Sequence, residues 1–434
     1  MRIIVQLLAA GLLSGLVAPS PAATPTLTTN QGIFRTGDTL VLSAGIVPTN
    51  DAGVKSDIYV AVVLPSGAVV TLDPNLVWNA ALVPIVTAFP LANLQAPDFY
   101  ALPLPALPGG LYNFHVVLTP TGTSPLDSSA RLGAASAPII LQTDSPSSTT
   151  VACAPPLYCG PIIDNHAHPT GPSGRSGIQD TYSDGLVALM DQNGVAMTAL
   201  HRNGFLLPPT GPAEFSASHD LWVASASQRH PGKILAYLAG FDPSSPDALT
   251  YIQEQFRASS QWKAIGELDL RNGFMQTQIS INSPNMLAVL RLAGQLRVPV
   301  IIHYQYDYGV DFATGMRELE DALSANPDTI VMMAHMPGLV LMARHPNLWA
   351  EITLWAPGVE QQLTSIVQSY PTLLDRIVLC ATDLQSPDLK VAGQTYGEVL
   401  ATNRRVLGTL AQEQAEKIAY KNLMRLLQPF PIQP

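Results

Sequence analysis

The sequence predicts an α/β protein, a (β/α)8 TIM barrel preceded by a small all-β sandwich. Beyond residue 160, short apolar runs alternate with amphipathic stretches of helical spacing. Several of these runs end in histidine, glutamate or aspartate, as strands do whose carboxyl ends converge on one site. Before residue 143, short strand patterns are separated by proline and glycine. A chain of 434 residues has room for both domains.

The chain begins with the pattern of a secretory signal peptide, residues 1–23. Arg2 is followed by an apolar run that is too short for a comfortable membrane span, and small residues follow it. We expect cleavage near Ala22 or Ala23 and a secreted or periplasmic protein, with an uncleaved anchor as the alternative. No later run is long and apolar enough to cross a bilayer, so no membrane span is expected in the mature protein.

Residues 24–143 are predicted to form the β-sandwich, because short strand patterns alternate with turn residues. The expected strands are residues 38–45, 57–64, 68–72 and 109–118. Part of this region, residues 58–72 and 110–118, resembles small Ig-like modules of bacterial exported proteins. His115 lies in the middle of a strand and is interpreted as structural. With no catalytic constellation, the region is expected to be a spacer, or to dock to another surface or domain.

Residues 144–160 are rich in small polar residues and are predicted to be the linker. Cys153 and Cys159 bracket five residues within it. In an oxidising compartment they would close a small disulfide loop, and two free thiols are the alternative. Cys380 lies in an apolar run and is predicted to be a buried thiol.

Residues 161–434 are predicted to form the barrel. The expected strands are residues 162–165, 196–200, 234–239, 264–267, 298–302, 330–334, 348–352 and 377–381. Helical spacing is clearest in residues 180–193, which end at Gly194, and in residues 286–296 and 412–427. An open parallel sheet is the alternative. The barrel is favoured because the first and last strands both carry candidate ligands, which must meet.

The first barrel strand runs into the motif Asp164-Asn-His-Ala-His168. Side chains alternate along a strand, so His166 and His168 point to the same face with Asp164 beside them. Two imidazoles directed at one point suit a divalent metal such as zinc. Pro169 cannot donate to a sheet and is expected to end the strand.

Four further potential ligands lie at the ends of later apolar runs: Glu267, His303, His335 and Asp383. Burying Asp383 at the end of such a run is costly unless the carboxylate is paired or binds a metal. Core histidines are the alternative for His303 and His335. For Glu267 the alternative is an ion pair with Arg271. Together with His166 and His168, these residues are the predicted metal ligands.

In this order, Asp-x-His-x-His, Gly-Glu, His, His and Asp resemble the amidohydrolase superfamily, and most closely its amidohydrolase-related branch. Residues 264–269 also resemble the Gly-Glu segment of TatD-type hydrolases. The resemblance implies one or two divalent ions, with zinc expected. It makes Asp383 the proton shuttle and His335 a residue that orients substrate or binds a second ion. Where some relatives carry a carboxylated bridging lysine, this chain has none, so a bridging carboxylate would have to be Glu267.

The sequence therefore predicts an exported metal-dependent hydrolase that acts on an amide, ester or lactone-like bond of a small molecule. A metal-dependent decarboxylase of the same branch, a TatD-like nuclease and a non-catalytic ligand-binding barrel are the alternatives. The formal charge is −10, with 22 Lys and Arg residues in the chain. This composition does not favour nucleic acid as a partner, because phosphate contacts need clustered basic residues.

Other polar residues near the strand ends are candidates for the mouth of the barrel: His201, Arg271, Tyr304 and Tyr306. A surface position is the alternative for His201. Arg271 is expected either to bind a substrate carboxylate or to pair with Asp269. Three more histidines are interpreted as surface residues, His219, His230 and His345.

Overall fold

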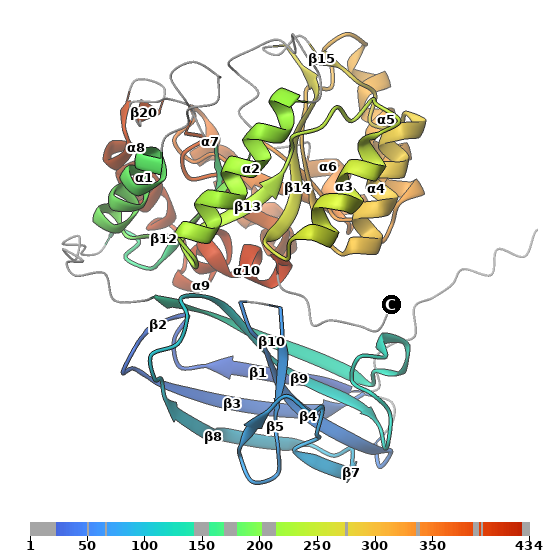
Figure 1. Cartoon of the computed structure of the whole chain (residues 1–434), viewed down its shortest axis with the longest axis vertical. Coiled ribbons are helices and arrows are strands. Elements are labelled where there is room, and N and C mark those ends of the chain that lie inside the picture. The colour runs from blue at the N-terminus through green and yellow to red at the C-terminus, as the bar shows by residue number, and fades with distance from the viewer. Residues whose placement is uncertain are drawn as a thin grey trace, which may run out of the picture.

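The computed structural model describes residues 23–49, 52–65, 67–142, 156–168, 180–201, 214–273, 277–335, 339–384, 390–391 and 394–427. The proposed signal peptide up to Ala22, Cys153 and Pro169 lie outside these ranges. Figure 1 shows two parts stacked on each other, a region of β-sheets and a mixed α/β region. They are called here the β-region (residues 23–142) and the barrel (residues 161–427).

The β-region contains two sheets. The first has the order β1 (Ala23–Thr29), β3 (Thr39–Pro48) and β8 (Leu94–Pro103). The second has the order β2 (Ile33–Arg35), β10 (Gly133–Gln142), β9 (Gly110–Pro120), β4 (Lys55–Val63), β5 (Val69–Leu72) and β6 (Trp78–Asn79), with β7 (Val86–Pro90) beside β4. All pairs are antiparallel except β2 with β10, and a short 3-10 helix covers Ser128–Ala130. Side chains of both sheets, among them Leu42 and Val116, share one hydrophobic core.

The predicted hairpin is present, with Val63 opposite Val69 in the register of β4 and β5. Its strands follow the rule that apolar side chains alternate toward the core. Val60 and Val62 belong to the core between the sheets, whereas Tyr59, Ala61 and Val63 form a second cluster on the other face. Both faces of the central strand β4 are therefore covered, which explains its continuous apolar sequence.

His115 lies in β9, between Ala61 of β4 and Ser136 of β10. Its side chain is buried, with 3% of the residue exposed. Burial, assisted by the charge of Arg131, lowers the pKa of His115 to about 3. The folded protein therefore holds this imidazole neutral in a range where an unfolded chain protonates it.

We expect this histidine to make the protein less stable in acid. Its pKa is lower in the folded state than the usual 6.5, so stability is lost as the pH falls from 6.5 towards 3. Between pH 6.5 and pH 5, the free energy of unfolding should fall by about 2 kcal/mol through this group alone. Urea unfolding of the parent and of His115→Gln over this range measures the difference. Equal pH slopes for the two proteins would contradict the assignment.

The barrel contains eight parallel strands in sequential order: β11 (Ile162–Ala167), β12 (Val195–Leu200), β13 (Ile234–Leu238), β14 (Trp262–Asn272), β16 (Val300–Tyr304), β17 (Val331–Met333), β18 (Leu348–Ile352) and β19 (Ile377–Leu379). Short strands β15 (Thr277–Gln278), β20 (Lys390–Val391) and β21 (Gln394–Thr395) lie outside this series. All eight strands coincide with predicted runs within a few residues.

The first strand meets the end of the last, so the sheet is a nearly closed barrel. Ala167 forms a parallel bridge with Leu384, and the His168 amide donates to the Leu384 carbonyl at 2.8 Å. The Asp383 amide donates to the carbonyl of His166 at 3.0 Å. This topology is consistent with a TIM barrel and differs from the open sheet that was the alternative.

Helices alternate with the strands around the barrel: α1 (Asp180–Asn193), α2 (Glu214–Arg229), α3 (Ala248–Ala258), α4 (Pro284–Leu296), α5 (Phe312–Ala325), α6 (Leu339–Arg344), α7 (Val359–Ser369), α8 (Tyr396–Leu407), α9 (Gln412–Glu416) and α10 (Asn422–Leu427). A 3-10 helix covers Pro371–Arg376. Gly194, with a φ of 65°, follows α1 as predicted. The helix predicted for residues 412–427 is interrupted by a π-helical turn at Lys417–Lys421. Among the described helices, none is long and apolar enough to span a membrane.

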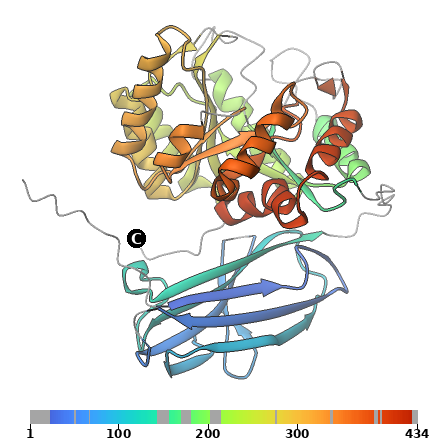
Figure 2. The ribbon, with the colours of Figure 1, turned by 180° about the vertical axis from the view of Figure 1, so that it is seen from behind.

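The β-region packs against the amino-terminal ends of the barrel strands (Figures 1 and 2). Leu111 and Ile140 of the β-region belong to the hydrophobic core of the barrel. At Gly232 the two backbones come so close that an added Cβ would lie 2.4 Å from the Gly110 nitrogen. Functional residues of such barrels lie at the opposite, carboxyl end of the strands, so the β-region is remote from that end.

Cys159 and Cys380 differ in oxidation state. Cys159 is disulfide-bonded, and its predicted partner Cys153 lies outside the described residues. Cys380 is free and buried, as its apolar surroundings in the sequence predict.

Candidate metal centre

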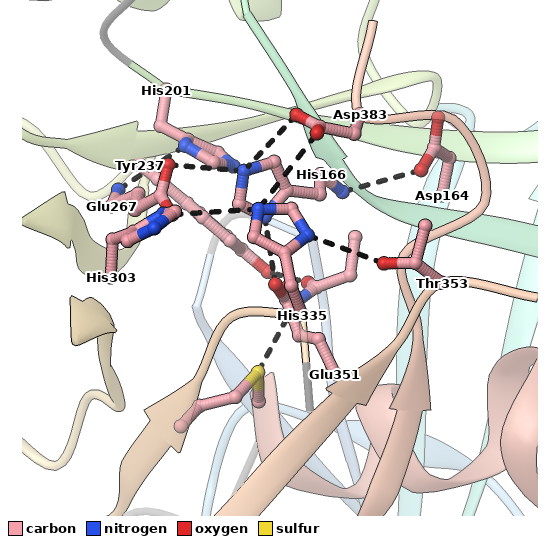
Figure 3. Close-up of polar contacts among 12 residues, drawn as sticks. Asp164, His166, His201, Tyr237, Glu267, His303, His335, Glu351, Thr353 and Asp383 are labelled. Carbon is pink, nitrogen blue, oxygen red and sulfur yellow. Dashed lines mark hydrogen bonds and ion pairs between the residues drawn. The ribbon is translucent and has the colours of Figure 1, made fainter. Parts of the chain in front are cut away.

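Six predicted ligands meet at the carboxyl ends of the barrel strands, and Figure 3 shows five of them, all except His168. Three lie within strands: His166 in β11, Glu267 in β14 and His303 in β16. The other three, His168, His335 and Asp383, lie in the segments that directly follow β11, β17 and β19. Parallel strands of one barrel thus bring together residues that are up to 217 positions apart, as 166 and 383 are.

One group of donor atoms surrounds the two histidines of the first strand. His166 Nε2 lies 3.2 Å from His168 Nε2 and 3.1 Å from Glu267 Oε2. Asp383 Oδ1 lies 3.5 Å from His168 Nε2 and 3.8 Å from His166 Nε2. Two nitrogen ligands of one tetrahedral zinc ion are roughly 3.3 Å apart, given bonds of about 2.0–2.1 Å. The spacing of these atoms therefore fits a shared cation.

A second group lies on the other side of Glu267. Its other carboxylate oxygen, Oε1, is 3.1 Å from His303 Nδ1 and 3.9 Å from His335 Nε2. His335 Nε2 is also 3.8 Å from Asp383 Oδ2. The two oxygens of Glu267 thus face different groups of imidazoles. This is the position that a carboxylate bridging two cations would occupy.

The backbone explains why glycine precedes Glu267. Gly266 has a φ of 118°, which side chains rarely allow, and an added Cβ would lie 2.2 Å from the Ile301 carbonyl oxygen of the neighbouring strand. His335 and Asp383 also have left-handed φ values, 56° and 51°. Such conformations cost energy in residues other than glycine and are found where the surroundings hold a functional side chain in place.

Glu351 of β18 lies behind the centre, and sequence reasoning missed it. It is fully buried, and its Oε2 is 2.7 Å from His166 Nδ1. It also accepts a hydrogen bond from the Asn165 amide, whose oxygen accepts from the Tyr237 hydroxyl at 2.5 Å. The sequence does carry a signal for it, because Glu351 is the one acid inside the apolar run Leu348–Ile352. A carboxylate buried in such a run needs a polar partner.

The protonation states of the histidines and the acids in the centre depend on each other. Burial alone would lower the pKa of His166, but the carboxylates of Glu351 and Glu267 raise it well above its usual value. Burial would raise the pKa of Glu267, but His166 and His303 hold it well below the usual value. Asp383 likewise has a lowered pKa, because His168, His166 and His335 outweigh its burial. Without a metal, the centre therefore favours ionised acids beside a protonated His166, and a bound cation would take the place of that proton.

His201 and Asp164 occupy different places from those expected. His201 follows β12 and is fully buried, with its ring centroid 4.3 Å from that of His166. Its Nδ1 accepts a hydrogen bond from the Glu267 amide at 3.2 Å, so the surface alternative for His201 is wrong.

Asp164 does not face the ligand atoms. It accepts hydrogen bonds from the Ala381 amide at 2.9 Å and from the Thr382 amide at 3.2 Å, which ties β11 to the segment that carries Asp383.

Arg271 pairs with Glu318, and not with Asp269 as one alternative expected. Its Nη2 donates to Glu318 Oε1 at 2.9 Å and its Nε to Glu318 Oε2 at 3.1 Å. Tyr304 donates to the same carboxylate at 2.5 Å and is buried, so it does not line an open mouth. His219, expected on the surface, is buried with 7% exposed. Glu318 lies 47 positions from Arg271 and 14 positions from Tyr304, so local sequence patterns did not reveal these pairs.

Glu351 should control metal affinity through His166. Glu351→Gln keeps the shape of the side chain but removes the charge that orients the Nδ1–H, so affinity should fall about 10–100-fold. Competition with a chromophoric chelator measures the change. Glu320→Gln makes the same chemical change on α5, where Glu320 pairs with Arg344, and should leave affinity unchanged. If both variants bound the metal with the same affinity, Glu351 would have no part in metal binding.

No family model matches the sequence, and no curated protein matches it. Solved structures that resemble the fold include a dihydroxybenzoic acid decarboxylase from Polaromonas sp. JS666 with bound manganese (TM-score 0.44, 13% identity, 62% of this chain and 96% of that chain). Another is 4-oxalomesaconate hydratase from Rhodopseudomonas palustris (0.45, 14%, 61% and 95%). A third is an enamidase described as a member of the amidohydrolase superfamily (0.42, 10%, 61% and 66%). These likenesses concern the fold and assign no reaction to this chain.

Proposed function

We propose that this protein is an exported metal-dependent hydrolase that uses metal-activated water on an amide, ester or lactone-like bond. The observation that carries the proposal is the position of Glu267, whose two oxygens face separate groups of imidazoles. The order of ligands along the chain, which resembles that of the amidohydrolase superfamily, supports it. Imidazole and carboxylate donors suit zinc, so zinc is the expected ion.

The residues divide into two groups around Glu267. His166, His168 and Asp383 would hold one cation together with Glu267 Oε2, and His303 and His335 would hold a second with Glu267 Oε1. A divalent cation bound there lowers the pKa of a bound water from ~15.7 towards ~7 and polarises a carbonyl oxygen. The further steps depend on the side chains of the protein.

Asp383 is the proposed proton carrier. The surrounding histidines keep its carboxylate ionised, and its oxygens lie 3.5 Å from His168 Nε2 and 3.8 Å from His335 Nε2, where it can accept the proton of the attacking water. It can then return that proton to the leaving group. Glu351 holds the Nδ1 side of His166, and Thr353 Oγ1 lies 3.2 Å from His335 Nδ1, so both rings keep their Nε2 atoms toward the centre.

Export is proposed from the signal-peptide pattern of residues 1–23. The disulfide at Cys159 supports it, because disulfides persist in oxidising compartments outside the cytosol. The β-region is proposed to be a separate sandwich domain without a catalytic role. Its position at the amino-terminal ends of the barrel strands supports this, since the ligands lie at the carboxyl ends.

The test is turnover on a panel of small esters, amides and lactones, with and without chelator. The proposal expects hydrolysis of at least one substrate class, loss of activity on metal removal and recovery when the metal is restored. Aromatic acids in the same assay, with carbon dioxide as the readout, test decarboxylation. Carbon dioxide release without any hydrolysis would overturn the hydrolase and identify a decarboxylase. Absence of all turnover in metal-loaded protein would favour a binding barrel.

A further inference from the structure

An apolar cavity of about 310 Å³ lies between the two sheets of the β-region. The three-stranded sheet contributes Leu102 of β8, and the other sheet contributes Val62 of β4, Val70 of β5 and Ile139 of β10. Among the described residues, no polar atom contributes to its wall. The cavity has no part in the metal centre, which the barrel holds at the opposite end of its strands.

The polar groups of the aromatic residues around the cavity are already paired elsewhere. Trp78 Nε1 donates to the Tyr100 hydroxyl at 2.9 Å, and the Tyr112 hydroxyl donates to the Pro108 carbonyl at 2.8 Å. The Trp78 ring meets the Phe114 ring edge-on, with centroids 5.9 Å apart. The wall therefore presents ring surfaces and aliphatic groups only, and it offers a ligand no hydrogen bond.

A cavity of this kind favours an apolar occupant. The space is open on one side, but water that lies against its wall finds no polar partner there, whereas a buried water needs two to four. Leaving it empty costs free energy that grows with its volume, because the lining atoms lose their contacts. An apolar cavity of about 150 Å³ already holds benzene, so this one has room for about twice as many carbon atoms.

The lining residues also indicate where a ligand enters. Leu64, Val70, Leu102 and Leu107 line the cavity and remain only half-buried, whereas Ile139 and Leu141 at its other side are buried. A ligand with one polar end can therefore place its chain against the buried residues and leave that end in water. Most of the lining is aliphatic, which suits a flexible alkyl chain.

We propose that this cavity binds an aliphatic chain of about ten carbon atoms whose polar head remains in solvent. A free fatty acid and the acyl chain of a membrane lipid share this chemistry. The site is independent of the hydrolase proposed for the barrel, because no residue that lines it is a proposed ligand.

The test uses the full mature chain and decanoate as the probe, at concentrations below its self-association, with butyrate as the short-chain control. Calorimetry should show saturable binding of decanoate and none of butyrate. Sedimentation with phosphatidylcholine vesicles distinguishes the sources. Protein that binds decanoate but not vesicles takes free acids, and protein that binds both takes lipid chains.

Two neighbouring positions of β5 provide matched variants. Val70→Phe fills the cavity, whereas Val69→Phe adds the same bulk on the opposite face, beside the cluster of Tyr59, Ala61 and Val63. Val70→Phe should weaken decanoate binding at least tenfold and raise the melting temperature of the ligand-free protein. Val69→Phe should bind decanoate as the parent does. If Val70→Phe does not fold, Leu107→Phe fills the cavity from the connection between β8 and β9.

The proposal is overturned if the parent protein shows no saturable binding of decanoate, or if the cavity-filling variant binds it as tightly as the parent. Neither result depends on the metal centre, since binding is measured without turnover. Failure here would leave the proposed hydrolase untouched.

Discussion

Replacement of Asp383 by asparagine is expected to lower the turnover number by about 10²–10⁴-fold while the metal remains bound. Asparagine keeps the shape and one oxygen donor, but it loses the charge and the basicity that a proton carrier needs. Asp383 Oδ1 lies 3.5 Å from His168 Nε2, and Oδ2 lies 3.8 Å from His335 Nε2, so the carboxylate touches both groups of the centre.

His166→Ala is the contrasting variant. His166 Nε2 is 3.1 Å from Glu267 and 3.2 Å from His168, so its loss removes a central ligand and the metal with it. The measurement is turnover together with metal content for both variants on one substrate that the parent hydrolyses. Near-normal turnover by Asp383→Asn would show that the proton passes through another group.

Glu267→Ala should reduce the metal content from two ions per chain to one. Without Glu267, the second group keeps His303, His335 and only a share of Asp383, whose Oδ2 lies 3.8 Å from His335 Nε2, so this group should lose its cation first. The first group keeps His166, His168 and Asp383, and three protein ligands are enough for a catalytic zinc ion. Turnover should fall by at least about 10²-fold, because one of the two cations that would stabilise the charge of the transition state is lost.

The measurement for Glu267→Ala is elemental analysis of the parent and the variant after equilibration with the same concentration of zinc. Glu320→Gln on α5, outside the centre, serves as the control and should keep two ions. A variant without Glu267 that still holds two ions would exclude the bridging position.

Much of the barrel could be predicted from the sequence, for a physical reason. A buried parallel strand needs an apolar run, and a polar side chain at its end is costly unless it has a partner. This rule singled out Asp383 as a candidate ligand, and the position of Glu267 at the end of an apolar run made it another. The two histidines of β11 could be paired because alternate residues of a strand share one face.

The rest depends on contacts between segments that are distant in the sequence. Glu351 sits in the middle of its strand, and its partner His166 is 185 positions away. Arg271 pairs with Glu318, which lies 47 positions further along the chain. The burial of His201 follows only once β12 is placed beside β11. Local sequence patterns indicate which polar residues need a partner when they are buried. Which residue becomes that partner depends on how the strands and helices pack.

The apolar cavity of the β-region shows the same limit. Strands β4, β5 and β9 were predicted from short apolar patterns, and part of their apolar residues do face the space between the sheets, whereas β8 and β10, which also line the cavity, were not predicted. The pattern could not indicate that Val70 and Leu102 line a space of about 310 Å³ instead of meeting each other, because the distance between the sheets is set by the whole region.

The central claim is that Glu267 bridges two cations in one chain. Elemental analysis of the mature protein, purified without chelator and then dialysed against zinc, tests it most directly. We predict two divalent ions per chain, loss of both together with turnover on treatment with chelator, and recovery of both when zinc is returned. Protein that binds only one divalent ion per chain, or none, or that keeps full turnover after complete metal removal, would contradict the account.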